Sequence, residues 1–307
     1  MIPILLAAAT FASPFSDGCF LQRDRPVEIW GEATPGEKVE LQFGDAGAET
    51  RAGDDGRWRV SLPPMPASCR GRELKANSTV VRDVVVGEVW LASGQSNMAF
   101  AFNSTNPRNS ERSSGLVGQL VRNANLRLAK VRPNASRVPL SKAEVVWRKA
   151  TPEELLGRGD FSAVAFYYGK TLQEALSVPV GIIEMSVGAT SIDAWMPAEE
   201  FSAYTPSKRK GNDPLVYFNG MVNPIAPYSA RGFIWYQGER NSDTAEWPLY
   251  RDKLASLFNG WRRVFRNPSL TMRMVQIVGP VHRSTMPHTQ CQQARFADET
   301  SDRKSVV

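Results

Sequence analysis

A buried strand that ends in a polar, glycine-containing turn is the feature of this sequence that most restricts its fold. The apolar, β-prone run Val84–Leu91 is followed closely by Gly94-Gln95-Ser96-Asn97-Met98. A continuous apolar run of this length is typical of a strand covered on both faces, as in the parallel sheets of α/β proteins. Open α/β sheets bind their ligands at the carboxyl ends of the strands. The pattern therefore predicts an α/β fold that presents Ser96 at the ligand-binding edge.

The pattern of the sequence changes at about residue 83. Between residues 15 and 82, short alternating runs such as Val27–Trp30, Val39–Phe43 and Trp58–Leu62 are separated by turns rich in Gly, Asp and Pro. This spacing predicts a small antiparallel, β-sandwich-like module over residues 15–82. From residue 83 to 307 strands and helices are expected to alternate, which indicates a sheet with helices on both faces.

The elements expected in this second part follow from hydrophobic runs and from helical spacing of apolar residues. The strands are predicted at Val84–Leu91, Leu126–Val131, Gly181–Val187, Arg231–Tyr236 and Met272–Val278. The helices are predicted at Phe161–Ser177 and Tyr250–Phe265. The polar segment Phe100–Ala124 is expected to be a surface excursion near the site.

Composition narrows the class of partner. The 307 residues are 42% hydrophobic and 22% charged, as in an ordinary soluble globular protein. The net charge is +6, but the basic residues are scattered, so a solvated basic surface is favoured and no nucleic-acid partner is expected. Cys19, Cys69 and Cys291 have no metal-type spacing, so no metal centre is predicted, and one disulfide or three free thiols stay open.

The amino terminus carries an apolar run, Ile2–Ala12, that is too short to span a bilayer. No membrane partner is therefore expected. The Ala-rich stretch resembles the hydrophobic core of a secretion signal, although it lacks the positive start. Residues 1–14 are interpreted as a signal or an unstructured leader, and a secreted or periplasmic location is expected, with a cytoplasmic one left open.

Three predicted strands end in loops whose residues suit acyl transfer. Ser96 can attack a carbonyl carbon as a nucleophile. The backbone N–H groups of Ser96 and Gly188 could donate to the oxyanion, and glycine lets the backbone approach closely. The side-chain amide of Gln237 or Asn241 could supply a third donor. Further residues of these loops are expected to bind substrate or to support the site: Gln95, Asn97, Glu239 and Asn241.

The three loops together resemble the sialate O-acetylesterase family of the SGNH/GDSL hydrolase superfamily. The similarity extends to Phe15-Ser16-Asp17 with Leu21-Gln22-Arg23-Asp24 and to Phe218–Pro224, and it spans roughly residues 15 to 300. It implies a flavodoxin-like, three-layer α/β/α sheet and serine-dependent removal of acetyl groups from sugar hydroxyls. It also implies Ser96 as the nucleophile, Gly188 and Gln237 as oxyanion donors, an acetylated carbohydrate as substrate, and no metal or organic cofactor.

The sequence departs from the family at its carboxyl end. The family carries an Asp-x-x-His pair there, after a strand whose beginning Ser305–Val307 resembles. That pair is not among these residues, so the α/β domain is expected to be incomplete and its turnover low. His282 and His288 are the histidines of the sequence, and Glu239 and Asp193 are further candidates for an acid or base. Natural loss, truncation and a frameshift all stay open.

Two other functions are compatible with the same residues. One is a non-catalytic, carbohydrate-binding relative that has lost its base. The other is an acetylesterase that acts on plant or microbial polysaccharide, because acetyl esters of many sugars present the same reacting group. The sequence predicts no oligomeric state.

Overall fold

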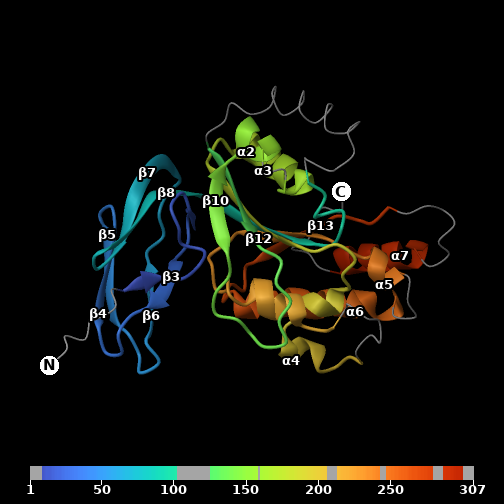
Figure 1. Cartoon of the computed structure of the whole chain (residues 1–307). Helices are drawn as coiled ribbons and strands as arrows, with labels where there is room; N and C mark the ends of the chain where they lie inside the picture. Colours follow the sequence, from blue (N-terminus) through green and yellow to red (C-terminus); the bar gives the residue numbers. More distant parts are fainter. Residues whose placement is uncertain are drawn as a thin grey trace.

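A small β module stands beside a larger α/β part, and a long strand connects them (Figure 1). The computed structural model describes residues 9–101, 125–157, 160–205, 213–242, 247–278 and 286–299. The strands of the module are β1 (Thr10–Phe11), β2 (Phe20–Gln22), β3 (Val27–Glu32), β4 (Lys38–Phe43), β5 (Ala46–Arg51), β6 (Arg57–Leu62) and β7 (Ser68–Ala76). One sheet has the order β1-β3-β6, and β4 pairs with both β5 and β7. All of these pairings are antiparallel, as the alternating runs of the sequence predict.

The α/β part is built on a parallel sheet. Its strands are β8 (Thr79–Gly94), β9 (Leu126–Val131), β11 (Val180–Ser186), β12 (Gly232–Tyr236) and β13 (Thr271–Met274). They run parallel in the order β9-β11-β8-β12-β13, and β10 (Val145–Lys149) adds an antiparallel edge next to β9. The predicted α/β class is confirmed.

Helices cover the two faces of this sheet (Figure 1). On one face lie α2 (Pro152–Gly157) and α3 (Ala163–Leu176), and on the other α4 (Ala198–Phe201) and α6 (Tyr250–Val264). The remaining helical segments are α5 (Glu239–Ser242), α7 (Met286–Asp298), η1 (Ile192–Trp195), the π-helical η2 (Phe218–Val222) and η3 (Trp247–Leu249). Side chains of β8 alternate between the faces: Leu91 joins the core under α6, whereas Trp90 and Ala92 join the core under α3. The sheet is therefore the middle of three layers.

Strand β8 belongs to both sheets. Its amino-terminal half pairs with β7 and β2, and its carboxyl-terminal half pairs with β11 and β12. It spans 16 residues, so it extends beyond the predicted strand at both ends. The predicted boundary between residues 82 and 83 falls inside this strand.

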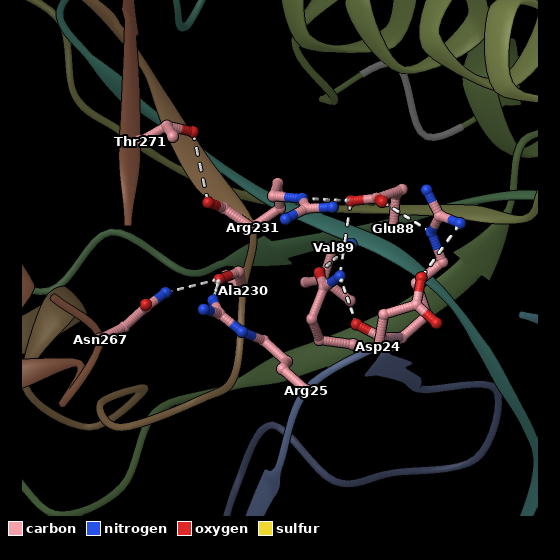
Figure 2. Close-up of polar contacts among 10 residues, drawn as sticks. Asp24, Arg25, Glu88, Val89, Ala230, Arg231, Asn267 and Thr271 are labelled. Carbon is pink, nitrogen blue, oxygen red and sulfur yellow. Dashed lines mark hydrogen bonds and ion pairs between the residues drawn. The ribbon is translucent and has the colours of Figure 1, made fainter. Parts of the chain in front are cut away.

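A polar cluster joins the two parts beside β8 (Figure 2). The Glu88 carboxylate is 2% exposed and lies 2.7 Å from Nε of Arg23 and 3.4 Å from Nε of Arg231. Arg25 donates to the carbonyl of Ala230 at 2.8 Å and the N–H of Glu28 donates to the Ser229 hydroxyl at 3.2 Å, so two residues of the module hold the segment before β12. Because both arginines around Glu88 remain partly exposed, the cluster gains charge pairing without full desolvation of the cations.

The first described residues are part of the module. Thr10 and Phe11 pair with Glu32 and Gly31 of β3, and the carbonyl of the fully buried Ala9 accepts a hydrogen bond from Thr79. Residues 9–14, expected to belong to a signal or an unstructured leader, thus lie in the fold, where Thr10 and Phe11 extend a sheet edge. None of the helices in the described ranges combines the length and the hydrophobicity of a membrane-spanning segment.

Candidate functional site

The ends of three parallel strands meet at Gly94. The N–H of Gln95 donates to the carbonyl of Tyr236 at 3.0 Å, and the N–H of Val187 donates to the carbonyl of Gly94 at 3.2 Å. Gly94 has a φ of +145°, and a Cβ there would lie 2.1 Å from the Tyr236 carbonyl oxygen. Only glycine allows β8 and β12 to approach this closely before the chain turns into the Ser96 loop.

Ser96 and Gly188 lie against each other at this edge. Ser96 is exposed, and a Cβ built on Gly188 would stand 3.7 Å from the Ser96 Cβ and 3.8 Å from its Cα. Within the described residues, neither backbone N–H donates a hydrogen bond, and the Ser96 hydroxyl has no partner. Two N–H groups and one hydroxyl without partners in the described ranges therefore belong to neighbouring residues, and an oxyanion site at this edge stays a prediction.

Gln237 is the centre of a buried network. Its side chain is fully buried, and Nε2 lies 3.1 Å from Gln95 Oε1, 3.1 Å from the Thr190 carbonyl and 2.8 Å from Asn241 Oδ1. A primary amide has two hydrogens, so these three oxygens already exceed its donor capacity. The sequence led us to expect Gln237 to donate directly to the oxyanion, but its amide nitrogen faces oxygens of the protein.

The network reaches Tyr250, whose role the sequence did not indicate. The Tyr250 hydroxyl lies 2.7 Å from the backbone carbonyl of Gln237 and 2.8 Å from its Oε1. Burial raises the pKa of this hydroxyl well above its ordinary value, so it stays a donor. Gln293 of α7 donates to the same carbonyl at 3.1 Å. Helical spacing identified Tyr250 only as a core residue, although a buried tyrosine hydroxyl needs a partner.

Asn97 and Glu239 form a direct contact beside Ser96. Asn97 Nδ2 donates to Glu239 Oε1 at 2.5 Å, and both side chains are half-buried. Burial and the charge of Glu239 raise the pKa of the neighbouring Tyr236. The pair ties the Ser96 loop to the start of α5, which is consistent with the supporting role predicted for both residues.

The Gly188 loop is anchored from its far side. Asn241 Oδ1 accepts the N–H of Ile192 at 3.1 Å, and Asp193 pairs with Lys253 of α6 at 2.7 Å, with both side chains buried. Asp193 was a candidate acid or base, but this ion pair gives it a structural partner. It fixes η1, and with it the loop that precedes η1.

A second buried carboxylate lies at the end of β11. Glu184 accepts hydrogen bonds from the N–H of Ser162 at 2.8 Å and from the hydroxyl of Ser186 at 2.6 Å, and Lys130 stands 3.6 Å away. Burial raises its pKa, and Lys130 opposes this rise. The sequence gave no sign of this residue because Glu184 stands in the middle of an apolar run.

The histidine that the structure describes is not in this cluster. His288 is exposed on α7, and its ring stacks on Trp247 with centroids 4.4 Å apart. His282 and the predicted excursion at 102–124 lie outside the described residues. Over the described ranges no group of three or more His, Cys, Asp or Glu side chains could hold a metal ion. The three cysteines are free thiols.

Comparison with known proteins identifies the family of the chain. Residues 86–306 match the family model of the carbohydrate esterases described as sialic acid-specific acetylesterase. Human sialate O-acetylesterase is 32% identical over an alignment of 292 positions, which covers 84% of this chain and 54% of the relative. The mouse enzyme is 28% identical over an alignment of 309 positions, which covers 83% of this chain and 56% of the relative. The chain thus spans about half the length of the curated relatives it matches.

A solved structure extends the likeness to the whole described fold. A carbohydrate acetylesterase from Xanthomonas citri superposes with a TM-score of 0.85 and 28% identity, over 98% of this chain and 68% of that one. The match includes the β module as well as the α/β part, since it covers nearly the entire chain. The resemblance found in the sequence and the predicted fold are both confirmed: the chain belongs to the sialic acid-specific acetylesterase family of carbohydrate esterases.

Proposed function

We propose that this protein is a serine-dependent carbohydrate O-acetylesterase. The observation that carries the proposal is the contact between Ser96 and Gly188, where an exposed hydroxyl adjoins two N–H groups without partners in the described ranges. Membership of a carbohydrate esterase family supports an acetylated carbohydrate as the substrate. Sialic acid and acetylated polysaccharide offer the same acetyl ester, so the test includes both.

In the proposed reaction, Ser96 Oγ attacks the acetyl carbonyl carbon and gives its proton to a base. The N–H groups of Ser96 and Gly188 donate to the oxyanion, and the sugar hydroxyl leaves with a proton. Water then hydrolyses the acetyl-serine to acetate and free enzyme. We assign Gln237 as a positioning residue, in place of the direct donor expected from the sequence, because its amide is occupied by Gln95, Thr190 and Asn241.

The test must allow for the base. A polypeptide of these 307 residues has two histidines, and His288 stacks on Trp247, so we expect little turnover from it unaided. Imidazole added as an external base should restore acetate release from O-acetylated sialic acid or acetylated xylan above a protein-free blank. Ser96→Ala should abolish this release, since it removes the attacking atom.

Two matched readouts make the test decisive. With the same imidazole present, a fluorophosphonate probe should label the protein at Ser96, as peptide mass spectrometry would show. Gly188→Ala adds a methyl group at ordinary contact distance from Ser96, so the fold should persist while labelling slows about tenfold or more. Imidazole-dependent acetate release that survives Ser96→Ala would overturn the assignment. If neither labelling nor acetate release occurs, the esterase proposal itself is wrong.

We also propose that the protein acts outside the cytoplasm, on the basis of the apolar run within Ile2–Ala12. Ala9 is fully buried, so cleavage of a signal that preserves the fold must occur before it. The amino-terminal residue of the mature protein tests this directly. A mature chain that begins after Phe11 contradicts it, because β1 would be lost.

A further inference from the structure

A groove separates the β module from two loops of the α/β part. It encloses about 820 Å³, within the range of small-ligand sites. Strands β1, β3 and β6 line one wall, and the other is lined by residues 139–142 with Asn223, Pro224 and Ala226. None of its lining residues belongs to the Ser96 loop, the Gly188 loop or the Gln237 network, so this intermodule groove is separate from the proposed catalytic site.

Trp30 provides an aromatic surface in the groove. Its ring packs edge to face against Phe15, with centroids 4.8 Å apart, and against Tyr228 at 6.4 Å, yet the side chain is only half-buried. Its indole N–H has no hydrogen-bond partner within the described residues. A tryptophan held in this way offers an apolar face for the C–H groups of a sugar ring and a donor for a hydroxyl.

Polar side chains flank Trp30 because of the strand register. Arg59 of β6 lies opposite Trp30, and Arg57 lies opposite Glu32, so all four occupy one stretch of the sheet. From the other wall, Lys142 reaches Glu32 at 2.8 Å, and Asn223 donates through Nδ2 to the carbonyl of Leu140, which leaves its amide oxygen as an acceptor. Donors and acceptors thus surround the aromatic ring on both sides of the groove.

The charges in the groove are paired. Lys142 pairs with Glu32, Arg57 stands 3.9 Å from Asp55, and Arg59 stands 4.0 Å from Glu28. Each cation has a carboxylate within 4.0 Å, so the groove has little net charge to attract an anion. A neutral ligand rich in hydroxyl groups fits both the paired charges and the aromatic ring.

We propose that the intermodule groove is a second carbohydrate-binding site, which holds a neutral glycan chain while Ser96 acts on an acetyl group elsewhere. The ligand class rests on the proposed function, because the substrate of that reaction is an acetylated carbohydrate. Binding does not require turnover, however, so the groove can be tested on a chain whose catalytic serine has been removed.

The experiment is affinity electrophoresis of the full chain carrying Ser96→Ala. The gels contain xylan, glucomannan or mixed-linkage β-glucan, and binding of a sialylated oligosaccharide is measured separately by calorimetry. At least one neutral polysaccharide should retard the protein. Adding Trp30→Ala should weaken that retardation at least about fivefold, since truncation of a central aromatic anchor typically costs more than 1 kcal/mol. Tyr167→Ala, which removes a ring that is 39% exposed on α3, is the matched control and should change nothing.

A second pair of variants guards against misfolding. Trp30→Phe keeps an aromatic ring against Phe15 and should retain part of the binding. Arg57→Gln alters a side chain that is 67% exposed, so it should fold normally and still weaken binding. Equal retardation of the parent, Trp30→Ala and Arg57→Gln overturns the proposal. So does failure of every neutral polysaccharide, or binding of the sialylated ligand alone.

Failure of the groove and failure of the esterase proposal give different results. Fluorophosphonate labelling of Ser96 in a Trp30→Ala chain that retains this serine reports on the catalytic site only. Normal labelling without polysaccharide binding rejects the groove and leaves the esterase intact. Polysaccharide binding that depends on Trp30, without labelling of Ser96, supports the groove and rejects the esterase.

Discussion

Replacing Gly94 by alanine tests whether the close approach of β8 and β12 determines the geometry of the site. The added Cβ would lie 2.1 Å from the Tyr236 carbonyl oxygen, and real contacts of this kind essentially never fall below 3.0 Å. The strands would therefore have to separate where Gln95 donates to that carbonyl. The φ of +145° adds strain, because side-chain-bearing residues rarely adopt it.

The expected loss can be built from these terms. Unfavourable backbone geometry costs about 1–3 kcal/mol. Loss of the hydrogen bond from Gln95 adds about 1 kcal/mol. The lower entropy of the unfolded alanine chain offsets about 0.4–1 kcal/mol. These terms sum to a fall of about 2 kcal/mol in the free energy of unfolding, and separation of the two strands by the added Cβ should raise it further, against the ~5–15 kcal/mol of a typical domain.

Gly36→Ala is the matched control. Gly36 also has a positive φ, +78°, but a Cβ there meets nothing within 4 Å. It carries the strain without the steric clash, so its net cost should stay within about 1 kcal/mol. Urea unfolding followed by the fluorescence of the eight tryptophans measures both variants. If Gly94→Ala loses no more stability than Gly36→Ala, the steric argument is refuted.

Two further predictions concern buried polar groups near the site. Burial raises the pKa of Glu184, so the folded state binds the proton of this carboxyl more tightly than the unfolded chain does. The contribution of Glu184 to the free energy of unfolding should therefore be fully present below pH 4.5, the ordinary pKa of a glutamate. It should fall as the pH rises from there through the raised pKa of the folded protein. Glu184→Gln should remove that decline, and urea midpoints measured at a series of pH values would show this. If the midpoints of the parent and of Glu184→Gln change with pH in parallel, the prediction is contradicted. Tyr250→Phe removes the hydroxyl that contacts Gln237, so it should cost about 1–2 kcal/mol and slow the labelling of Ser96. Labelling must not slow in Tyr228→Phe, which loses a buried hydroxyl that donates to the carbonyl of Phe20 instead of to Gln237.

The elements that the sequence predicted well are those with a strong local pattern. The strand Leu126–Val131 has the predicted bounds, and the helix over Tyr250–Val264 ends one residue earlier than expected. Strand β5 is not among the runs named from the sequence: the chain reverses at Gly44 and Asp45, and β5 begins at Ala46. Strand β5 has small and charged residues in alternation, so its hydrophobic signal is too weak to identify it.

The site was predictable in part for the same reason. Ser96 and Gly188 follow buried strands directly, so the parallel sheet brings them together once its order is known. The partners of Gln237 could not be predicted, because they depend on which side chains meet after the layers pack. Tyr250 comes from a helix and Thr190 contributes a backbone carbonyl, and neither carries a local pattern that indicates such a contact.

The continuity of β8 has a consequence for how the two parts of the protein move. No linker separates the module from the α/β part along this strand, so the flexible reach that a chain of Gly and Ser would give is absent. The module can neither swing like a tethered appendage nor be cut away without removing the central strand of the parallel sheet. A glycan held in the intermodule groove would accordingly stand at a fixed distance and orientation from Ser96. The spacing of acetyl groups along a polymer, relative to the residue bound in the groove, would then decide which of them the serine can reach.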